Sequence, residues 1–240
     1  MAMRLSTKKR PDREDKRTKP ERRLEEDVFD RASLFAITKL RRKGYFDIVD
    51  YCVAKGKEAN VYRATAKDGK FIALKIYRLH ATSFIHMQQY IEGDRRFEKA
   101  AHSAFGVIFT WTKKEFKNLS LLAEMGVPAP KPIAFIRNIL VMEFLGEKGV
   151  PFSTLAETGS ENPDSDYEYL LSQIGIMWKN GLVHGDLSEY NIMMTDNGPY
   201  LIDCGQAVLT THPRAEEFLI RDKRNLLRYF SKYPDFTKKE

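Results

Sequence analysis

The alternation of hydrophobic and polar positions predicts a β-rich first half of the chain and a more helical second half. β-Branched and aromatic residues recur at strand spacing before residue 145, and the Asp68-Gly69 pair between two such runs is typical of a hairpin turn. One helix interrupts the strands, because apolar positions there follow a helical period up to Gly126. The predicted strands are residues 48–53, 60–65, 71–77, 132–136 and 139–144.

Helical periodicity predicts four helices, at residues 28–43, 112–124, 166–180 and 214–230. Residues 80–110 are less regular and are expected to form a long insertion with some helix, whereas residues 146–164 are rich in turn residues and are expected to be a connector. Short apolar segments follow at 192–194 and 200–202. This order is compatible with a small β-rich lobe and a helical lobe, although the motifs below are needed to establish that arrangement.

The composition narrows the class of protein. The chain has 240 residues, of which 42% are hydrophobic and 30% charged, as in ordinary globular proteins. Its apolar runs are far shorter than the roughly 20 residues that span a bilayer, and its N-terminus shows no secretory signal. Cys52 and Cys204 have no metal-ligand spacing and fit a reducing compartment. We therefore expect a cytoplasmic protein with no membrane partner.

The positive charge of the chain is concentrated at its N-terminus. The net charge is +7, and residues 1–26 carry ten Lys and Arg against six Asp and Glu, a surplus of +4. A flexible, solvated tail is the simpler interpretation of such a segment, and an RNA-contacting arm is the alternative. Charge alone favours the tail and leaves the arm open.

The strongest chemical signal is a loop that carries His184, Asp186 and Asn191, followed by Asp203 after an apolar segment. Protein kinases place a catalytic Asp and a metal-binding Asn at the same spacing, with a second metal-binding Asp further on. Phosphoryl transfer needs these groups because it depends on positioning the phosphates and on metal ions that neutralise charge. A lone Asp and Asn at this spacing would indicate only a turn, but the flanking residues favour the catalytic interpretation.

A lysine on the third predicted strand completes this pattern. Lys75 lies in an Ala-Leu-Lys-Ile run that is similar to the kinase strand whose lysine contacts the α- and β-phosphates. An edge lysine pointing to solvent is the structural alternative. Its expected carboxylate partner is Glu115, on the helix that follows, although Glu92, Glu98 and Glu124 are also candidates.

The loop between the first two strands departs from the kinase pattern. It has a single glycine where most kinases have three, and two lysines flank it. The backbone amides of one glycine turn, together with cationic side chains, are still able to hold phosphates. The candidate ATP-binding residues in and after this loop are Lys55, Gly56, Lys57, Glu58 and Val61.

These motifs together resemble the RIO family of atypical serine/threonine kinases, over residues 45–233. The specific segments are 56–62, 90–97, 114–119, 184–191 and 217–225. Ser188, Glu189 and Tyr190 are similar to the first subfamily, and the 54 residues before Lys55 leave no room for the winged helix of the second. The resemblance implies an α+β, two-lobed kinase-like fold in which residues 1–26 are a tail, 27–145 the N-lobe with its preceding helix and the hinge, and 146–240 a truncated C-lobe.

The resemblance also implies a role for individual residues. Asp186 is the expected catalytic Asp, and Asn191 and Asp203 are expected to hold Mg²⁺, with Mn²⁺ as an alternative. In this family phosphate is passed through an aspartyl-phosphate, here on Asp203, which is reasonable for a carboxylate nucleophile. Lys75 is expected to bind the phosphates of ATP. The expected adenine-binding hinge is Met142, Glu143 and Leu145.

Two further features bear on the resemblance. Cys204 and Gly205 depart from the residues expected after the metal-binding Asp, although Gln206 is retained, and Cys204 is expected to be a small buried residue. Only 37 residues follow Asp203, so no peptide-docking platform is expected. The family acts in maturation of the small ribosomal subunit, which implies pre-ribosomal particles, rRNA and ribosomal proteins as partners and favours the RNA-arm interpretation.

Two other functions stay open at the level of sequence. Aminoglycoside and choline kinases share the His-Gly-Asp loop, which makes a small-molecule kinase the first alternative. A non-catalytic RNA-binding assembly factor with an inactive nucleotide pocket is the second. Ser83 and Ser103, in the expected insertion, are candidate autophosphorylation sites.

Overall fold

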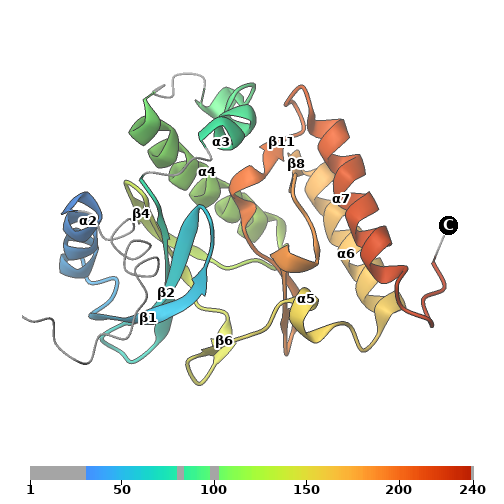
Figure 1. Ribbon diagram of the computed structural model, residues 1–240, viewed down its shortest axis with the longest axis horizontal. Coiled ribbons are helices and arrows are strands. Elements are labelled where there is room, and N and C mark those ends of the chain that lie inside the picture. The colour runs from blue at the N-terminus through green and yellow to red at the C-terminus, as the bar shows by residue number, and fades with distance from the viewer. Residues whose placement is uncertain (1–30, 80–83, 98–102, 239–240) are drawn as a thin grey trace, which may run out of the picture.

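The computed structural model describes residues 31–79, 84–97 and 103–238, and these form two lobes (Figure 1). The first lobe is built on a five-stranded antiparallel sheet with the strand order β1-β2-β3-β5-β4. The expected tail, residues 1–26, lies outside the described residues. The strands are β1 (Ile48–Lys55), β2 (Ala59–Thr65), β3 (Phe71–Tyr77), β4 (Pro132–Ile136) and β5 (Ile139–Glu143).

The hairpin of β2 and β3 confirms the turn that Asp68 and Gly69 predict. Gly69 has a φ of +83°, a left-handed conformation that a residue without a Cβ adopts at little cost. The register pairs Val61 with Lys75, so these two residues lie side by side on the sheet. The five strands match the predicted ranges closely, because runs of β-branched and aromatic residues bounded by turn residues favour strands.

Two helices pack against the sheet. The first, α2 (Arg31–Arg42), buries Ala36 and Leu40, which join the apolar cluster beneath the sheet. The second, α4 (Ala104–Met125), is eight residues longer at its start than predicted. Ser103 begins it, because its Oγ accepts a hydrogen bond from the Gly106 amide at 3.2 Å. Gly126 ends it as predicted, with a φ of 72°.

The second lobe is mainly helical. It contains α5 (Leu155–Thr158), α6 (Pro163–Lys179) and α7 (Ala215–Phe230), with α6 and α7 packed together (Figure 1). Three short two-stranded antiparallel sheets accompany these helices. Their strands are β6 (Gly146–Glu147), β7 (Val150–Pro151), β8 (Leu182–Val183), β9 (Ile192–Thr195), β10 (Gly198–Leu201) and β11 (Val208–Leu209).

Two irregular regions hold more structure than predicted. The connector at residues 146–164 contains β6, β7 and α5, which are too short to show a period in the sequence. The insertion at residues 80–110 contains α3 (Phe84–Ile91) and the first turns of α4. Of the two candidate phosphorylation sites, Ser83 lies outside the described residues. No helix among the described residues is both long and apolar enough to cross a membrane.

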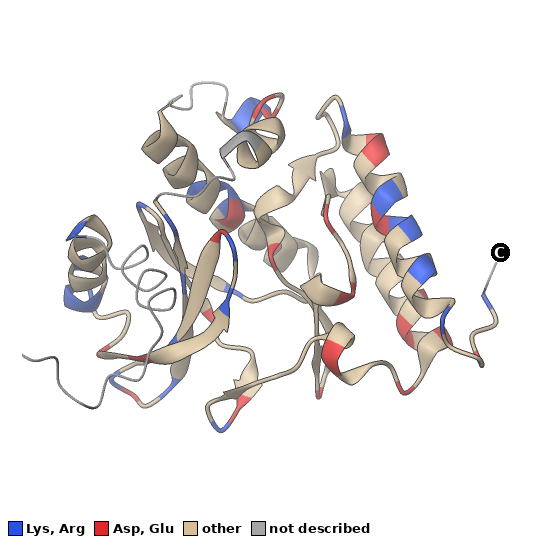
Figure 2. Cartoon of the chain, viewed as in Figure 1, with Lys and Arg blue, Asp and Glu red and all other residues tan. Residues whose placement is uncertain are grey.

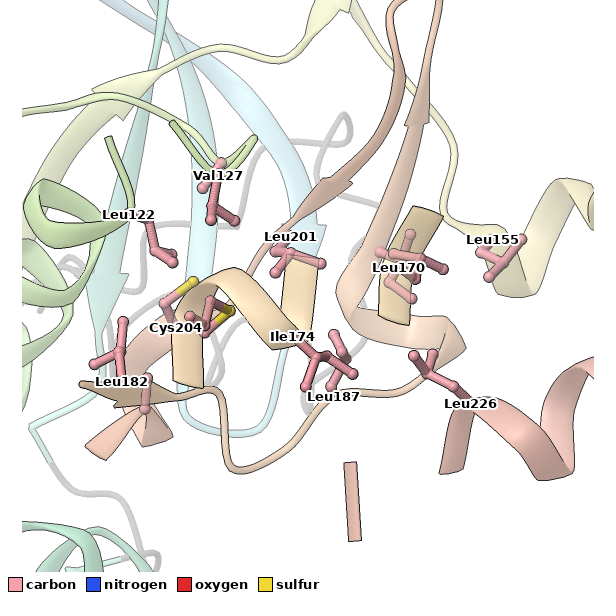
Figure 3. Packing of buried hydrophobic residues seen from close by; sticks show 14 of the residues in the cluster. Leu122, Val127, Leu155, Leu170, Ile174, Leu182, Leu187, Leu201, Cys204 and Leu226 are labelled. Atoms are coloured by element: carbon pink, nitrogen blue, oxygen red, sulfur yellow. The ribbon is translucent and has the colours of Figure 1, made fainter. Parts of the chain in front are cut away.

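A core of leucine, isoleucine and aromatic side chains joins the two lobes. Leu122 and Val127 of the first lobe pack in one cluster with Leu170 and Ile174 of α6 (Figure 3). Cys204 is fully buried in this cluster, as the sequence predicts for a small apolar residue. The core therefore fixes the segment after Asp203 against both lobes.

Candidate active site

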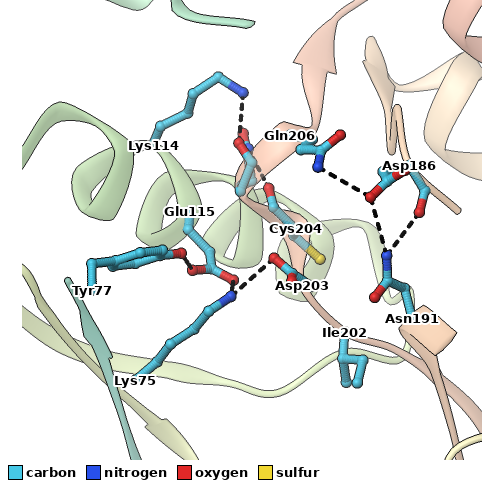
Figure 4. Close-up of polar contacts among 12 residues, drawn as sticks. Lys75, Tyr77, Lys114, Glu115, Asp186, Asn191, Ile202, Asp203, Cys204 and Gln206 are labelled. Atoms are coloured by element: carbon cyan, nitrogen blue, oxygen red, sulfur yellow. Dashed lines mark hydrogen bonds and ion pairs between the residues drawn. The ribbon is translucent and has the colours of Figure 1, made fainter. Parts of the chain in front are cut away.

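Lys75 is the central residue of the site between the lobes. Its Nζ donates to Glu115 Oε1 at 2.7 Å and to Asp203 Oδ1 at 2.9 Å (Figure 4). Lys75 comes from β3, Glu115 from α4 and Asp203 from the second lobe. The structure therefore selects Glu115 as the carboxylate partner from the four candidates in the sequence, and it brings three of the predicted site residues together.

Tyr77 belongs to this cluster and was not among the residues predicted from sequence. Its hydroxyl donates a short hydrogen bond to Glu115 Oε2, so both oxygens of that carboxylate are occupied. Tyr77 follows Lys75 by two positions on β3, and residues two apart share a face of a strand. That spacing is the signal in the sequence that identifies it.

The charges in this cluster shift the pKa values of its members. Burial lowers the pKa of Lys75, but Asp203 and Glu115 outweigh burial and hold it well above its ordinary value. Burial raises the pKa of Glu115 although Lys75 acts in the opposite direction. The partly enclosed position of Asp203 opposes its ionisation, yet the charge and hydrogen bond of Lys75 lower the pKa of that carboxyl overall. Lys75 is therefore cationic and Asp203 anionic at neutral pH.

Asp203 has a strained backbone, directly before the turn of residues 204–206. Its φ and ψ are 57° and 58°, in the left-handed region that few residues other than glycine adopt. Such strain persists only where the surrounding structure imposes it, and it is concentrated at functional sites. Lys75 and Glu115 are buried, whereas 52% of the Asp203 side chain is exposed. The carboxylate is thus presented to the space between the lobes.

Asp186 and Asn191 form the second half of the site. Asn191 Nδ2 donates to the Asp186 carbonyl at 2.8 Å, and Gln206 Nε2 donates to Asp186 Oδ2 at 3.0 Å (Figure 4). Burial and the charge of Asp203 raise the pKa of Asp186. Gln206, for which the sequence alone predicts no role, therefore orients the carboxylate of Asp186.

Helix α7 holds the loop that carries Asp186. Asp222 is buried and accepts hydrogen bonds from the amides of Gly185 at 2.8 Å and Leu187 at 2.9 Å. Asn225 donates to the Leu187 carbonyl at 3.1 Å, and Arg221 donates to the Gly185 carbonyl. The backbone on both sides of Asp186 is thus fixed from one helix. Nothing in the sequence pattern of 217–225 distinguishes these contacts from ordinary helical polar positions.

Helix α4 holds the segment after Asp203. Lys114 is fully buried and donates to the carbonyls of Gly205, at 2.9 Å, and Ala207. Asn118 donates to the carbonyls of Cys204 and Ala207, both at 2.8 Å. Gly205 has no room for a side chain, because a Cβ there would lie 2.7 Å from Trp111 Nε1. This contact gives a physical reason for the glycine at that position.

The turn between β1 and β2 carries the residues that the sequence predicts to hold phosphates. The Gly56 amide donates to the Ala59 carbonyl at 2.9 Å, which closes the turn, and Lys55 and Lys57 are exposed on it. Burial, together with the charge of Asp203, raises the pKa of Glu58. Val61 pairs with Lys75. The structure therefore places Val61 beside Lys75 and Glu58 within the electrostatic influence of Asp203 and Lys75, while the binding of ATP by the predicted residues stays a prediction.

The predicted hinge occupies the end of β5 and the connection to the second lobe. The Glu143 amide donates to the Lys131 carbonyl at 2.8 Å, and the Leu145 carbonyl accepts from the Phe152 amide at 3.1 Å. Met142 is partly buried against the core that joins the lobes. These residues link the lobes where the sequence places the hinge, and their contact with adenine stays a prediction.

The oxygen atoms of Asn191 and Asp203 fit a hard cation such as Mg²⁺. Asn191 uses its amide nitrogen on Asp186, which leaves the amide oxygen as the end that a metal can bind. No group of three or more His, Cys, Asp or Glu residues is arranged to hold a metal in the described ranges. Mg²⁺ is suited to such a sparse site, because it keeps several waters and takes its other ligands from phosphates.

The two lobes, the ion-paired Lys75 and the loop of Asp186 and Asn191 define a phosphotransferase of the protein-kinase class. A family profile described as the RIO domain matches residues 60–239 of this chain. The chain belongs to the RIO family of serine/threonine-protein kinases and is of the Rio1 type. This confirms the family and the kinase-like α+β fold expected from the sequence.

Relatives of known class cover most of the chain. RIO-type serine/threonine-protein kinase Rio1 of Haloferax volcanii is 45% identical over 208 residues, which are 87% of this chain and 72% of the relative. Rio1 of Thermoplasma acidophilum is 40% identical over 173 residues, which are 72% of this chain and 91% of the relative. The chain is therefore a serine/threonine kinase.

A solved structure supports the fold. The Rio2 kinase–ADP/Mg²⁺–phosphoaspartate complex from Chaetomium thermophilum superposes with a TM-score of 0.67 at 26% identity, over 85% of this chain. The match covers 61% of that structure, so this chain spans less than two thirds of its length. The likeness confirms the two-lobed arrangement and leaves the roles of single residues as predictions.

Proposed function

We propose that this chain is an ATP- and Mg²⁺-dependent phosphotransferase that acts on the maturing small ribosomal subunit. The observation that carries the first part is Lys75 Nζ held between Glu115 and Asp203 at 2.7 and 2.9 Å. A buried lysine with two carboxylates is arranged to receive phosphate oxygens, and kinases use the same pair. Mn²⁺ is the second candidate ion, since it accepts the same oxygen ligands.

The residues of the site act mainly by positioning. Lys75 binds the phosphates of ATP, while Asn191 and Asp203 hold Mg²⁺ against them. The metal supplies positive charge where negative charge develops as the terminal phosphoryl group leaves. Asp186, oriented by Gln206 and Asn191, lies beside the incoming hydroxyl group or water and accepts its proton.

Asp203 is also the proposed site of a covalent step. The related Rio2 kinase was solved as a phosphoaspartate complex with ADP and Mg²⁺. In this step an Asp203 oxygen bonds to the γ-phosphorus as the bond to the β,γ-bridging oxygen breaks, and ADP leaves with that electron pair. Water then hydrolyses the acyl phosphate to inorganic phosphate and restores the carboxylate.

The test follows the phosphate of ATP labelled at its γ-position. Wild-type protein with Mg²⁺ is expected to release labelled phosphate and to carry acid-labile, hydroxylamine-sensitive label. Asp203→Ala is expected to lose both, whereas Asp196→Ala, an exposed Asp in the turn between β9 and β10, keeps both. ATP turnover that persists in Asp203→Ala would contradict the proposal, and acid-stable label on serine would replace the covalent step with direct transfer.

The ribosomal part of the proposal is supported by charge and by the family resemblance. Residues 1–26 carry +4 of the net charge of +7, and a polycationic segment is attracted to RNA phosphates. Full-length protein is expected to co-sediment with precursor small-subunit particles, with affinity that falls steeply as salt rises. Deletion of residues 1–26 should reduce that salt dependence. Equal binding to mature and precursor particles would argue against a role in maturation.

Autophosphorylation is a further part of the proposal. Ser103 is exposed and caps α4, and a phosphate at a helix N-terminus interacts favourably with the helix dipole. Acid-stable label that maps to Ser103 or Ser83 and is lost in the Asp186→Ala variant would support it. Label that persists in that variant would show that another enzyme adds it.

A further inference from the structure

A groove of about 310 Å³ lies between α6 and α7. Residues of α6 form one wall at intervals of one helical turn, and residues of α7 form the other. None of the residues assigned to the active site lines it. The lining residues are Tyr167, Leu171, Gly175, Lys223, Arg224 and Leu227.

One end of the groove is apolar and firmly packed. The ring of Tyr167 lies 5.7 Å from that of Phe230 and 5.1 Å from that of Phe236. Leu171 and Leu227 are only partly buried and continue this surface along the two helices. A preformed apolar floor of this kind accepts an apolar side chain without first rearranging.

Gly175 keeps the groove free of a side chain at this position of α6, and the fold itself does not require a glycine there. It lies in the interior of α6, where glycine costs about 1 kcal/mol relative to alanine. A Cβ at Gly175 would meet no heavy atom within 4 Å, and its φ is not in the left-handed region. Neither packing nor backbone conformation within the described residues explains the glycine, but an occupant of the groove would.

The charge beside the groove is positive. Lys223 and Arg224 are exposed, and basic bands follow one another along α7 (Figure 2). Neither Lys223 nor Arg224 forms an ion pair within residues 31–79, 84–97 and 103–238. The nearby acidic side chain of Glu168 is already paired with Lys238 at 2.6 Å. The groove therefore presents unneutralised cations next to an apolar floor.

We propose that this groove docks a protein partner through a short segment with one large apolar side chain flanked by Asp or Glu. The apolar side chain occupies the space beside Gly175, over Leu171 and Leu227, and the acidic residues face Lys223 and Arg224. Charge complementarity selects an acidic segment, and the apolar floor selects a peptide over RNA, whose contacts are mainly to phosphates.

The experiment selects displayed short random peptides on the full-length wild-type chain and counter-selects on Gly175→Gln. The glutamine side chain fills the groove, and the helix is expected to be at least as stable because glutamine is a better helix former. We expect enriched peptides to share an apolar residue with acidic neighbours. Their affinity is expected to fall at least about tenfold in Gly175→Gln and in Lys223→Glu/Arg224→Glu, as for loss of a central contact.

The matched control reverses another adjacent basic pair. Arg42→Glu/Lys43→Glu changes the net charge equally, at exposed positions at the end of α2, and should leave peptide affinity unchanged. The proposal is overturned if no peptide is enriched over the Gly175→Gln background, or if the enriched peptides lack acidic residues. The proposal is also overturned if single-stranded RNA displaces the peptides and if RNA binding depends on Lys223 and Arg224 but not on Gly175. That result would show that this face binds RNA.

Discussion

Lys75 remains charged in a nearly buried position because two carboxylates share its ammonium group. Burial alone disfavours the charge, so the contacts with Glu115 and Asp203 decide its state. Tyr77 completes the arrangement by occupying the second oxygen of Glu115. Each of these residues therefore depends on the others, and removal of one leaves a buried polar group without its partner.

Replacement of Tyr77 by phenylalanine tests this dependence. The variant leaves Glu115 Oε2 without its donor, which should cost about 1 to 3 kcal/mol of stability. Because Glu115 then holds Lys75 less firmly, we expect KM for ATP to rise several-fold. Steady-state kinetics and chemical denaturation measure both effects. Tyr51→Phe is the control, because Tyr51 lies on the edge strand β1 and its hydroxyl donates to the Gly149 carbonyl, away from Glu115. An equal rise in KM for ATP in Tyr51→Phe would contradict the argument.

His184 is a second residue whose charge state is fixed by burial. It is buried beside the Ile202 carbonyl, with Nε2 at 3.2 Å, and burial lowers its pKa to about 4. In the unfolded chain the pKa returns to about 6.5, so the unfolded state takes up a proton first as the pH falls. The imidazole is therefore neutral in the folded protein at physiological pH.

This shift predicts a pH dependence of stability. The free energy of unfolding should decrease from about pH 6.5 to about pH 4, with a contribution from His184 of roughly 3 kcal/mol. The His184→Gln variant should lose that part of the dependence, and His86→Gln, at an exposed position, should keep it. Denaturant titrations across this pH range measure the difference. If the free energy of unfolding depends on pH in the same way in wild type and in His184→Gln, His184 does not cause the pH dependence.

At the scale of elements, α4 links the two halves of the active site. Glu115 faces Lys75 of the first lobe, while the preceding Lys114 and the following Asn118 hold carbonyls of the segment after Asp203. Burial lowers the pKa of Lys114 to about 7, although its contacts are with backbone oxygens. A displacement of α4 would therefore move Glu115 and the backbone after Asp203 together.

Lys114→Met is expected to disturb this linkage. The apolar chain fills similar space but cannot bond to the carbonyls of Gly205 and Ala207, so the segment that positions Asp203 loses one of the two α4 side chains that hold it. We expect kcat to fall about ten- to hundredfold, with a smaller change in KM for ATP. Kinetics and the free energy of unfolding are measured together. Lys113→Met, at the exposed neighbouring position, is the control, and an unchanged kcat in Lys114→Met would refute the proposed support.

At the scale of the whole molecule, the active site draws its residues from both lobes. Lys75 and Glu115 belong to the first lobe, and Asp186, Asn191 and Asp203 belong to the second. A ligand that contacts both sets binds only when both are folded and correctly apposed. Binding should therefore stabilise the molecule as one unit.

A non-hydrolysable ATP analogue with Mg²⁺ should raise the melting temperature by roughly 5 to 10 °C at about a hundredfold excess over its Kd. Removal of Mg²⁺ with EDTA should abolish much of this shift. Asp203→Asn should show a smaller shift that EDTA no longer alters, because the metal loses its carboxylate ligand. Thermal scanning with and without EDTA tests this, and equal shifts in the two proteins would remove Asp203 from the metal site.

The sequence predicts well the parts of the molecule that have a strong period or a fixed spacing. The strands β3 and β4 have the predicted bounds, and the spacing of Asp186, Asn191 and Asp203 identifies the site. These features are local, because a run of β-branched and aromatic residues and the length of a loop both depend only on consecutive residues. The family assignment depends on the same local motifs.

The sequence could not supply contacts between distant segments. Asp222 meets the amides of Gly185 and Leu187 across more than 30 positions, and Gly205 is required by Trp111 on another element. The sequence does not predict the early start of α4, because its first turns lie in an irregular region with a glycine at 106. Such features depend on packing in three dimensions, which a single sequence does not encode as a pattern.

The contacts of α7 with the loop around Asp186 have a consequence for the order in which the protein is made. During synthesis, residues 184–191 leave the ribosome before residues 215–230, yet the carbonyls and amides beside Asp186 receive their partners only from Arg221, Asp222 and Asn225. A nascent chain that already contains Asp186, Asn191 and Asp203 therefore still lacks the contacts that fix the backbone on both sides of Asp186. We therefore expect kinase activity only after α7 has emerged and folded.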